Sequence, residues 1–387
     1  MNTADAVQPI DRSSEGTGAA TSRAFVLAGG GTGGHISPGL AIAERLRSID
    51  PSCRPIFACS TRPIDAAMLR EADAEFVPIP AEPLSFQPGK LFRCITASVR
   101  GRRAARVLLR DAHVAHVVAL GGFVTFPVVA AARSLGVPVL LVNLDAAPGK
   151  ANRWVAGRAR RVLSAVPTAA LPNFAERVIG MPIRRVAIAP SDPVSCREAL
   201  GLRGAWPTLL VTGASQGASS LNELLIELAR RRRELFSGWQ VFHLCGQGDR
   251  GALERAYASA DIHAKVEPFL HRMGLAWGAA DLALSRAGAN SVAEAAANAV
   301  PTLFAPYPYH KDLHQKFNAQ PLVDDGCAAM ELDRIGAMEN LDGLGRALGD
   351  LMTDPARRRA MRERLLARPR EDAATTIAKI LLASGER

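Results

Sequence analysis

Cysteine is scarce and scattered in this chain. The six cysteines, at positions 53, 59, 94, 196, 245 and 327, form no C-x-x-C pair. Structural zinc sites and disulfide frameworks depend on such spacings, so the sequence signals neither of them. We expect these residues to be reduced thiols in the hydrophobic core.

Long apolar runs are also missing. The apolar stretch from Val117 to Val142 is interrupted by glycines, prolines and Arg133, which is typical of strands alternating with a helix and not of a membrane span. Residues 1–22 lack the apolar segment of a secretory signal and are rich in small polar residues. We therefore expect a disordered N-terminal tail and a protein that stays in the cytoplasm.

Aromatic residues make up only 5% of the chain, whereas the net charge is +10. The excess of positive charge indicates an anionic partner. No aromatic-rich basic motif that would stack nucleic-acid bases is present. Nucleic acid is therefore disfavoured as a partner, compared with a phosphorylated substrate or a phospholipid surface.

The length of 387 residues exceeds what one hydrophobic core usually serves. Strand-like runs alternate with helical stretches in both halves, which favours two doubly wound α/β domains. The strand-like runs are 25–27, 55–58, 116–120, 137–142 and 161–165, then 208–211, 240–244, 265–266, 281–285, 302–305 and 328–331, with helices over 100–110 and 128–135. We divide the chain into a tail (1–22), a first domain (23–180), a linker (181–206), a second domain (207–354) and a C-terminal amphipathic helix (355–387).

A strand, a glycine-rich turn and a helix occur in this order in each half. In the first half, Ala24–Ala28 leads into Gly29-Gly30-Gly31-Thr32-Gly33-Gly34-His35, and in the second half, Thr208–Val211 leads into Thr212-Gly213-Ala214-Ser215-Gln216-Gly217. Such turns direct backbone N–H groups and a helix N-terminus at one point, which favours anions. Two anionic substrates are predicted, one for each half, beyond the carboxyl ends of the strands.

The first turn matches a dinucleotide-binding pattern, Gly29-x-Gly31-x-x-Gly34, which is weak evidence alone. A nicotinamide enzyme would place an acidic residue after the second strand, and residues 56–60 offer none. An oxidoreductase is thus disfavoured. His35 follows the glycines at a predicted helix N-terminus, where the dipole keeps the imidazole neutral and available as a base. Alternatively, His35 only caps the turn.

Two motifs of the second half have alternative interpretations. Glu294 could accept hydrogen bonds from both hydroxyls of a ribose, but Ser291-x-x-Glu294 is also a capping box. The polar loop Tyr307–Asn318 suits either a ligand contact or a solvated surface. Its two histidines, His310 and His314, lack a carboxylate that would complete a metal site. No D-x-D pair follows a strand in the first half, so we expect neither a metal nor a cofactor.

A basic and apolar stretch runs from Lys90 to Arg110. It interleaves lysine and arginine with leucine, isoleucine, valine and Phe92. This composition suits a patch that rests on an anionic membrane surface. An ordinary amphipathic helix with a basic solvent face has the same composition.

Taken together, these features resemble the MurG family, the lipid-linked N-acetylglucosaminyltransferases of peptidoglycan synthesis. The resemblance extends from about Phe25 to the C-terminal helix and comprises five ordered blocks. The blocks are Gly30-Gly31-Thr32-Gly33-Gly34-His35 with Pro38, Gly121-Gly122-Phe123-Val124, Gly180-Met181-Pro182-Ile183-Arg184, Gly213-Ala214-Ser215-Gln216-Gly217-Ala218 with Asn222, and Ser285–Glu294 with His314-Gln315.

The resemblance implies a GT-B glycosyltransferase on the cytoplasmic face of the inner membrane, held peripherally by an anionic surface. It would move N-acetylglucosamine from UDP-N-acetylglucosamine to the C4 hydroxyl of lipid I, with inversion. The implied donor-binding residues are Thr32, Gly33, Gly34, Asp145, Arg184, Ser215, Gln216, Asn222, Leu270, Ala289, Asn290, Ser291, Glu294, His314 and Gln315.

Within this donor set, Ser215 and Gln216 would meet the diphosphate, the Leu270 backbone the uracil, and Glu294 the ribose. Arg184 would reach toward the leaving phosphates, and His314 with Gln315 would contact the sugar. The implied acceptor-binding residues are Gly30, Gly31, Gly121, Gly122, Phe123 and Thr125, with Thr32, Gly33 and Gly34 also facing the attacking hydroxyl. His35 would be the general base.

Two departures from the family pattern affect the acceptor side. Val142-Asn143-Leu144-Asp145 stands where the family usually has His-Glu-Gln-Asn, so a carboxylate replaces an amide and Asp145 becomes a rival base. Phe123 stands where the family often has tyrosine and cannot hydrogen-bond. A glycosyltransferase with another glycolipid or natural-product acceptor is therefore an alternative, and so is an inactive nucleotide-sugar-binding relative.

Overall fold

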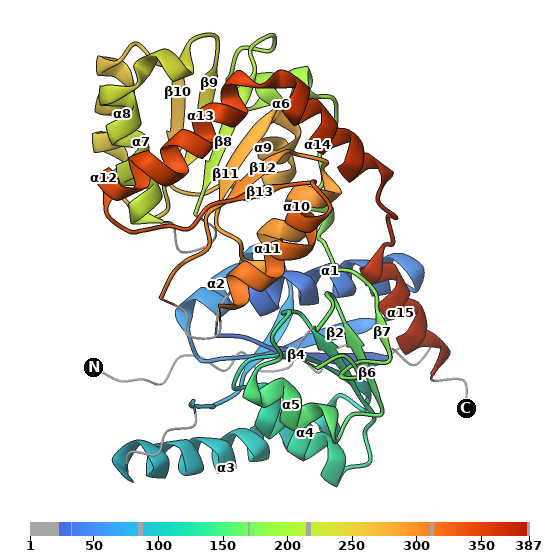
Figure 1. Ribbon diagram of the computed structural model, residues 1–387. Coiled ribbons are helices and arrows are strands. Elements are labelled where there is room, and N and C mark those ends of the chain that lie inside the picture. Colours follow the sequence, from blue (N-terminus) through green and yellow to red (C-terminus); the bar gives the residue numbers. More distant parts are fainter. Residues whose placement is uncertain are drawn as a thin grey trace.

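The computed structural model describes residues 23–31, 33–83, 88–168, 171–213, 218–309 and 313–384, with side chains from residue 93 onward in the helix that begins at Pro88. These residues form two parallel sheets. Figure 1 shows the second half of the chain above the first. The sheet of the first half has the strand order β3-β2-β1-β4-β5-β6-β7, and that of the second half has the order β10-β9-β8-β11-β12-β13.

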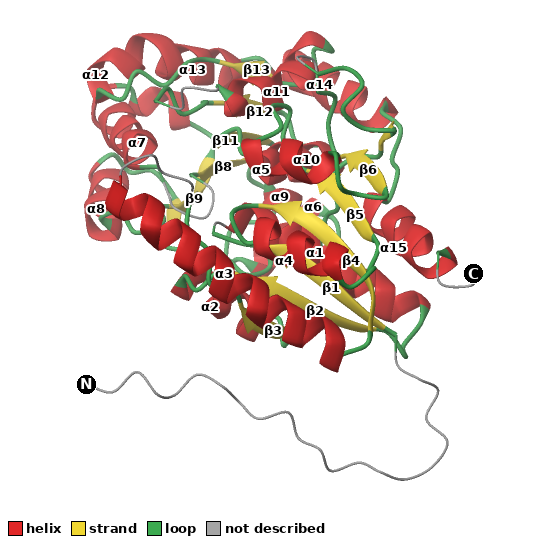
Figure 2. Cartoon of the chain, turned by 90° about the horizontal axis from the view of Figure 1, so that it is seen from below, coloured by secondary structure: helices red, strands yellow, loops and turns green. Residues whose placement is uncertain are grey.

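The first sheet contains β1 (Ala24–Gly29), β2 (Arg54–Cys59), β3 (Glu75–Pro78), β4 (Val114–Gly121), β5 (Val139–Asn143), β6 (Arg161–Ser164) and β7 (Arg177–Val178). Its helices are α1 (Gly33–Ile49), α2 (Pro63–Glu71), α3 (Pro88–Asp111), α4 (Thr125–Ser134) and α5 (Lys150–Ala156). β1 is an inner strand and pairs in parallel with β2 and β4. The view from below in Figure 2 shows α3 as a long helix along the outer side of this half, where it packs on α4.

The second sheet contains β8 (Thr208–Thr212), β9 (Gln240–Leu244), β10 (Ala264–Glu267), β11 (Leu282–Ser285), β12 (Thr302–Phe304) and β13 (Ala329–Met330). Its helices include α6 (Pro193–Ala199), α7 (Ser219–Arg231), α8 (Arg250–Ser259), α9 (Met273–Ala279), α10 (Ala289–Ala297) and α11 (His314–Asp324). The chain ends with α12 (Ala337–Asn340), α13 (Arg346–Thr353), α14 (Pro355–Ala367) and α15 (Ala373–Ala383). Short segments are η1 (Arg185–Ala187), η3 (Arg233–Phe236) and the π-helical η4 (Leu341–Gly345).

The central strands are buried on both sides. All six residues of β1 are buried, as are all five of β8, which is typical of parallel sheets covered by helices on each face. Two apolar clusters flank each sheet, one on each side. The alternating pattern of the sequence therefore predicted both sheets, and the two-domain GT-B α/β class is confirmed by solved relatives described below.

The C-terminal region differs from the single helix expected over 355–382. It forms two helices because Arg368 has an extended backbone (φ −68°, ψ 142°) immediately before Pro369, as the residue before a proline usually does. The second helix, α15, packs on α1, and its Ile377 and Leu381 are buried in the core of the first half. Figure 1 shows this return of the chain to the lower half. The short edge strands β3 and β7 were not predicted, since neither has a continuous apolar run.

Candidate functional site

His35 is the third residue of α1, directly after the first glycine-rich turn. Its Nδ1 lies 3.3 Å from the carbonyl oxygen of Gly30. Because a carbonyl only accepts hydrogen bonds, the neutral ring carries its proton on Nδ1 and leaves Nε2 with a free lone pair. Burial lowers the pKa of His35, although Asp145, the Gly30 carbonyl and Asp65 act in the opposite direction. The ring is therefore neutral and can accept a proton at Nε2.

Gly121 and Gly122 close against the first turn. Both have a positive φ, +120° and +81°, and neither position has room for a side chain. A Cβ on Gly121 would lie 2.8 Å from His35 Nε2, and one on Gly122 would lie 2.4 Å from the Gly30 oxygen. The structure thus brings these predicted residues together and places the free nitrogen of His35 beside Gly121.

Two residues that belong to no predicted motif, Asn152 and Asp65, also lie in the surroundings of His35. A Cβ on Gly121 would also lie 3.4 Å from Asn152 Oδ1 of α5. This oxygen is buried and has no hydrogen-bond partner among the described residues. Asp65 of α2 is fully buried, and its Oδ2 accepts from Gly31 N–H at 2.7 Å and from the Ser60 hydroxyl at 2.6 Å. The Gly31 N–H is consequently engaged in a hydrogen bond within the protein. The sequence offers only a weak indication of this role, because an acidic residue such as Asp65 is common in the first turn of a helix that begins with proline.

Other predicted acceptor residues support the turn in different ways. Thr125 is fully buried, and its hydroxyl donates to the Gly122 oxygen at 2.7 Å. Phe123 is 41% exposed. Asp145 is anchored through its backbone oxygen, which accepts from Asn143 Nδ2 at 2.7 Å. The Asn143 side chain is fully buried and also accepts from Asn152 at 3.0 Å.

In the second half, Glu294 lies on α10 and accepts a hydrogen bond from Trp277 Nε1 at 2.9 Å. The N-cap of α10 is Gly288, so Ser291 lies inside the helix. The capping-box alternative is therefore wrong. Burial raises the pKa of Glu294 to about 7, while the Trp277 hydrogen bond and the Arg184 charge oppose this rise.

Arg184 comes from the linker, as predicted. Its Nε donates to Glu44 Oε1 of α1 at 3.2 Å. The linker itself is fixed to α10 because Asn298 accepts from Ala189 N–H at 2.8 Å and donates to the Ala187 oxygen at 2.9 Å. Arg184 is thus anchored on α1 of the first half, and its charge acts on Glu294 of the second.

The two halves meet where the predicted residues gather. Helix α10 packs on α1, with Ala289 and Ala293 against the core of the first half. Asn290 Nδ2 donates to the Gly34 oxygen at 3.3 Å. At another point of contact, His271 of the second half pairs with Glu71 of α2. The first turn therefore faces the helix that carries Glu294.

The structure describes only some of the other predicted donor residues. Ser215 and Gln216 lie outside the described residues, as does Thr32. Asn222 is buried, with its amide donating to the Cys245 oxygen at 3.1 Å and its Oδ1 3.0 Å from His243 Nε2. Burial lowers the pKa of His243 to about 3, so this histidine is neutral. Asn222 therefore ties α7 to β9 and to the residue that follows this strand.

The neighbouring loops hold further polar groups. His314 begins α11, and the next residue, Gln315, accepts from Tyr307 N–H at 2.9 Å. Arg286, which the sequence analysis did not select, forms a buried ion pair with Asp333 at 2.6 Å and donates to Ser220 at 2.8 Å. The residues that the structure describes contain no group of three or more His, Cys, Asp or Glu side chains able to hold a metal ion.

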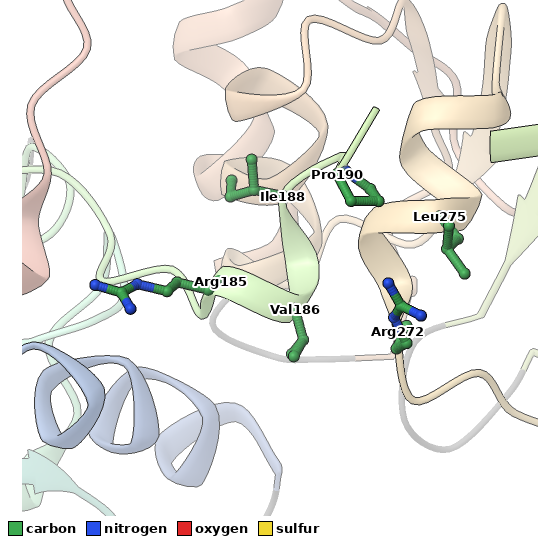
Figure 3. Close-up of a pocket in the computed structure, with 6 residues that line it drawn as sticks. All are labelled: Arg185, Val186, Ile188, Pro190, Arg272 and Leu275. Carbon is green, nitrogen blue, oxygen red and sulfur yellow. The ribbon is translucent and has the colours of Figure 1, made fainter. Parts of the chain in front are cut away.

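A separate cavity of about 200 Å³ lies beside the linker. It is lined by Arg185, Val186, Ile188, Pro190, Arg272 and Leu275. In Figure 3 the Arg185 side chain points away from Arg272, and it donates to Ser48. The two cations do not converge, so this cavity is not the candidate site.

Comparisons with known proteins agree with this arrangement. Residues 25–164 match the glycosyltransferase family 28 N-terminal domain, and residues 208–377 match its C-terminal domain. The chain is 35% identical to a UDP-N-acetylglucosamine–N-acetylmuramyl-(pentapeptide) pyrophosphoryl-undecaprenol N-acetylglucosamine transferase of Mycobacterium bovis, over 98% of this chain and 94% of the relative. A relative of the same name from Streptomyces avermitilis is 36% identical over 78% of this chain and 82% of its own length.

A solved structure gives the same result. The crystal structure of MurG from Acinetobacter baumannii superposes with a TM-score of 0.71 at 25% identity, covering 93% of this chain and 99% of that one. Natural-product glycosyltransferases, such as that of kitacinnamycin, share the fold at lower identity, with a TM-score of 0.62 at 17% identity. The chain therefore belongs to the MurG family of glycosyltransferase family 28.

Proposed function

We propose that this protein transfers N-acetylglucosamine from UDP-N-acetylglucosamine to the C4 hydroxyl of lipid I, forming lipid II with inversion. The observation that carries this proposal is the position of His35. Its unprotonated Nε2 lies beside Gly121, on the face of the first half that meets α10 and Glu294. A neutral imidazole there can take the proton of an attacking hydroxyl.

The first half supplies the base. When the acceptor hydroxyl attacks the anomeric carbon of the donor sugar, its proton passes to His35 Nε2 and the bond to the diphosphate breaks. The carboxylates of Asp145 and Asp65 favour the protonated ring electrostatically. They therefore stabilise the imidazolium that forms in this step.

The second half supplies the donor site. Glu294 receives the ribose hydroxyls, the backbone at Leu270 the uracil, and His314 with Gln315 the sugar. The departing diphosphate gains negative charge, and a nearby cation would stabilise it. We assign this role to Arg184, whose charge already acts on Glu294. The assignments of Glu294 and Arg184 are supported by the packing of α10 on α1 and by the hydrogen bond of Arg184 to Glu44 of α1.

The lipid-linked acceptor requires a membrane surface, and α3 suits this role. Ile95, Val99 and Val107 are 54%, 48% and 59% exposed, next to the exposed Arg102 and Arg103. Apolar side chains among cations favour an anionic bilayer. None of the described helices is both long and apolar enough to span a membrane, and we propose peripheral attachment at the cytoplasmic face.

Exposed aromatic side chains adjoin the glycine pair of the proposed acceptor site. Phe123 directly follows Gly122, and Phe126 of α4 packs on Trp154 at a tilt of 43°, with a centroid distance of 4.4 Å. Phe123 and Phe126 are 41% and 42% exposed. Since α3 packs on α4, the exposed aromatic rings and the basic helix belong to one side of the first half. A lipid-linked sugar could reach His35 without leaving the bilayer.

One assay tests the proposal. The protein is incubated with radiolabelled UDP-N-acetylglucosamine and a lipid I analogue, with donors that differ in base or sugar as controls. We expect transfer from this donor alone and a β-linked product. If the protein binds the donor and transfers the sugar to another glycolipid but not to lipid I, the alternative of a glycosyltransferase with a different acceptor is supported. The departure from the family pattern at Asp145 suggests that alternative.

A further inference from the structure

We propose that Trp277 is a positioning residue of the donor site: its buried indole N–H fixes the Glu294 carboxylate in the orientation that receives the ribose. The inference rests on the proposed function, because it concerns how the donor is bound. The hydrogen bond is 2.9 Å long and joins α9 to α10. No other side-chain hydrogen bond to the Glu294 carboxylate is found among the described residues.

The indole ring is well suited to this role because it is buried and closely packed. Trp277 is 1% exposed and is among the largest fully buried side chains of the described chain. It packs in the apolar cluster with Phe242 and Phe304 of the neighbouring strands. An indole N–H is a donor only, so the ring holds Oε2 in a single direction. The Glu294 oxygens keep further lone pairs for the hydroxyls of a ribose.

The position of Trp277 also links two contacts of the same nucleoside. Helix α9 begins at Met273, shortly after Leu270, whose backbone is proposed to meet the uracil. Trp277 lies on this helix and reaches α10, where Glu294 is proposed to meet the ribose. One rigid side chain thereby sets the spacing between the base contact and the ribose contact.

The same hydrogen bond favours the ionised carboxylate. Burial alone would keep Glu294 protonated, and its pKa is raised to about 7. The other charge that acts on it is Arg184 of the linker, which is itself paired with Glu44 of α1. Removing the Trp277 N–H leaves only Arg184 to oppose burial, so the carboxyl should stay protonated to a higher pH.

The test is a Trp277→Phe variant, which keeps an aromatic ring and removes the N–H. We measure UDP binding by calorimetry from pH 6 to pH 9, together with KM and kcat for the sugar donor. We expect roughly 10-fold weaker UDP binding at pH 7, an increased KM with little change in kcat, and a midpoint of the pH dependence about one pH unit higher. An unchanged affinity and midpoint would overturn the proposal.

Two further variants separate positioning from loss of packing. Trp239→Phe truncates another buried tryptophan of the same half, 6% exposed, and should lower the melting temperature without changing the affinity or its pH midpoint. In a double-mutant cycle, Trp277→Phe added to Glu294→Gln should weaken UDP binding no further than Glu294→Gln alone. Additive losses would mean that Trp277 acts by packing. A wild-type protein that binds no UDP would instead contradict the proposed function.

Discussion

His35 and Glu294 lie on helices α1 and α10, which pack on each other from opposite halves of the molecule. Burial acts on both side chains and favours the neutral form of each: it lowers the pKa of His35 and raises that of Glu294 to about 7. For a general base the neutral form is the active one. For a carboxylate that must accept two hydrogen bonds, the neutral form is a disadvantage.

The neighbours of the two groups differ accordingly. Near His35, Asp65 and Asp145 are carboxylates, which favour the imidazolium that forms when the base has reacted. Near Glu294, the Trp277 N–H and the Arg184 guanidinium favour the ionised carboxylate before the donor binds. With the proposed roles, the first half favours the positive charge that His35 gains on proton transfer, and the second half favours the negative charge with which Glu294 receives the ribose.

The largest expected effect comes from removing the base. His35→Ala should lower kcat by roughly 10²- to 10⁴-fold while UDP affinity stays nearly unchanged, because the proposed contacts to the uracil and the ribose, at Leu270 and Glu294, lie in the other half. The acid limb of the pH–rate profile, which we expect below the ordinary imidazole pKa, should also vanish. Steady-state kinetics with UDP binding in parallel measures both.

The matched control is His263→Ala, which changes a histidine of the second half. It should leave kcat and the acid limb as they are in the wild type. Near-normal turnover in His35→Ala, together with loss of turnover in Asp145→Asn, would make Asp145 the base and reverse the roles assigned to the first half.

The raised pKa of Glu294 should also appear in the stability of the protein. The pKa is about 7 in the folded state and 4.5 by reference, so the folded state holds this proton more tightly. The resulting stabilisation is fully present below pH 4.5 and is lost as the pH rises through 7. It amounts to up to about 3 kcal/mol. Glu294→Gln has no proton to lose and should lack this part of the pH dependence.

Urea unfolding at pH 5 and pH 8 measures the difference. The wild type should lose more free energy of unfolding over this interval than Glu294→Gln does. Equal losses in the two proteins would show that the carboxyl titrates as it does in solvent, and the contrast between the two helices would then disappear.

A smaller effect is expected on donor affinity. Glu294→Ala removes the proposed ribose contact and should weaken UDP binding by about 10-fold or more. Because Gly288, and not Ser291, caps α10, the substitution removes no helix cap. Calorimetry with UDP, and with 2′-deoxy-UDP as a comparison, tests the contact. A wild-type affinity that does not distinguish the two nucleotides would argue against Glu294 as the ribose ligand.

Much of the architecture follows from sequence patterns. The strands that precede the two glycine-rich turns and the parallel α/β class of both halves could be predicted, because buried parallel strands have continuous apolar runs. The edge strands β3 and β7 could not, since Glu75 and Arg177 interrupt any such run. The end of α14 could have been predicted from Pro369, because the residue before a proline is usually extended.

The candidate site was less predictable, and the reason is tertiary contact. His35 and Gly121 lie far apart in the sequence, and only the fold shows that Nε2 faces the glycine. Asp65 and Trp277 belong to no recognisable motif and act through residues that do. A local pattern was even misleading at Ser291, where the spacing of a capping box occurs inside a helix that begins at Ala289.

The smallest expected effect concerns the proposed membrane-binding surface of the first half. Arg102→Ala on α3 should weaken binding to vesicles with anionic lipid by about 5-fold, since one basic residue near such a surface contributes about 1 kcal/mol. The effect should fade as salt rises, because the attraction is screened. Arg233→Ala, an exposed arginine of the second half, is the matched control and should bind as the wild type does. Sedimentation with neutral and anionic vesicles at two salt concentrations distinguishes the variants. If both substitutions weaken vesicle binding equally, both halves contact the membrane and α3 is an ordinary amphipathic helix.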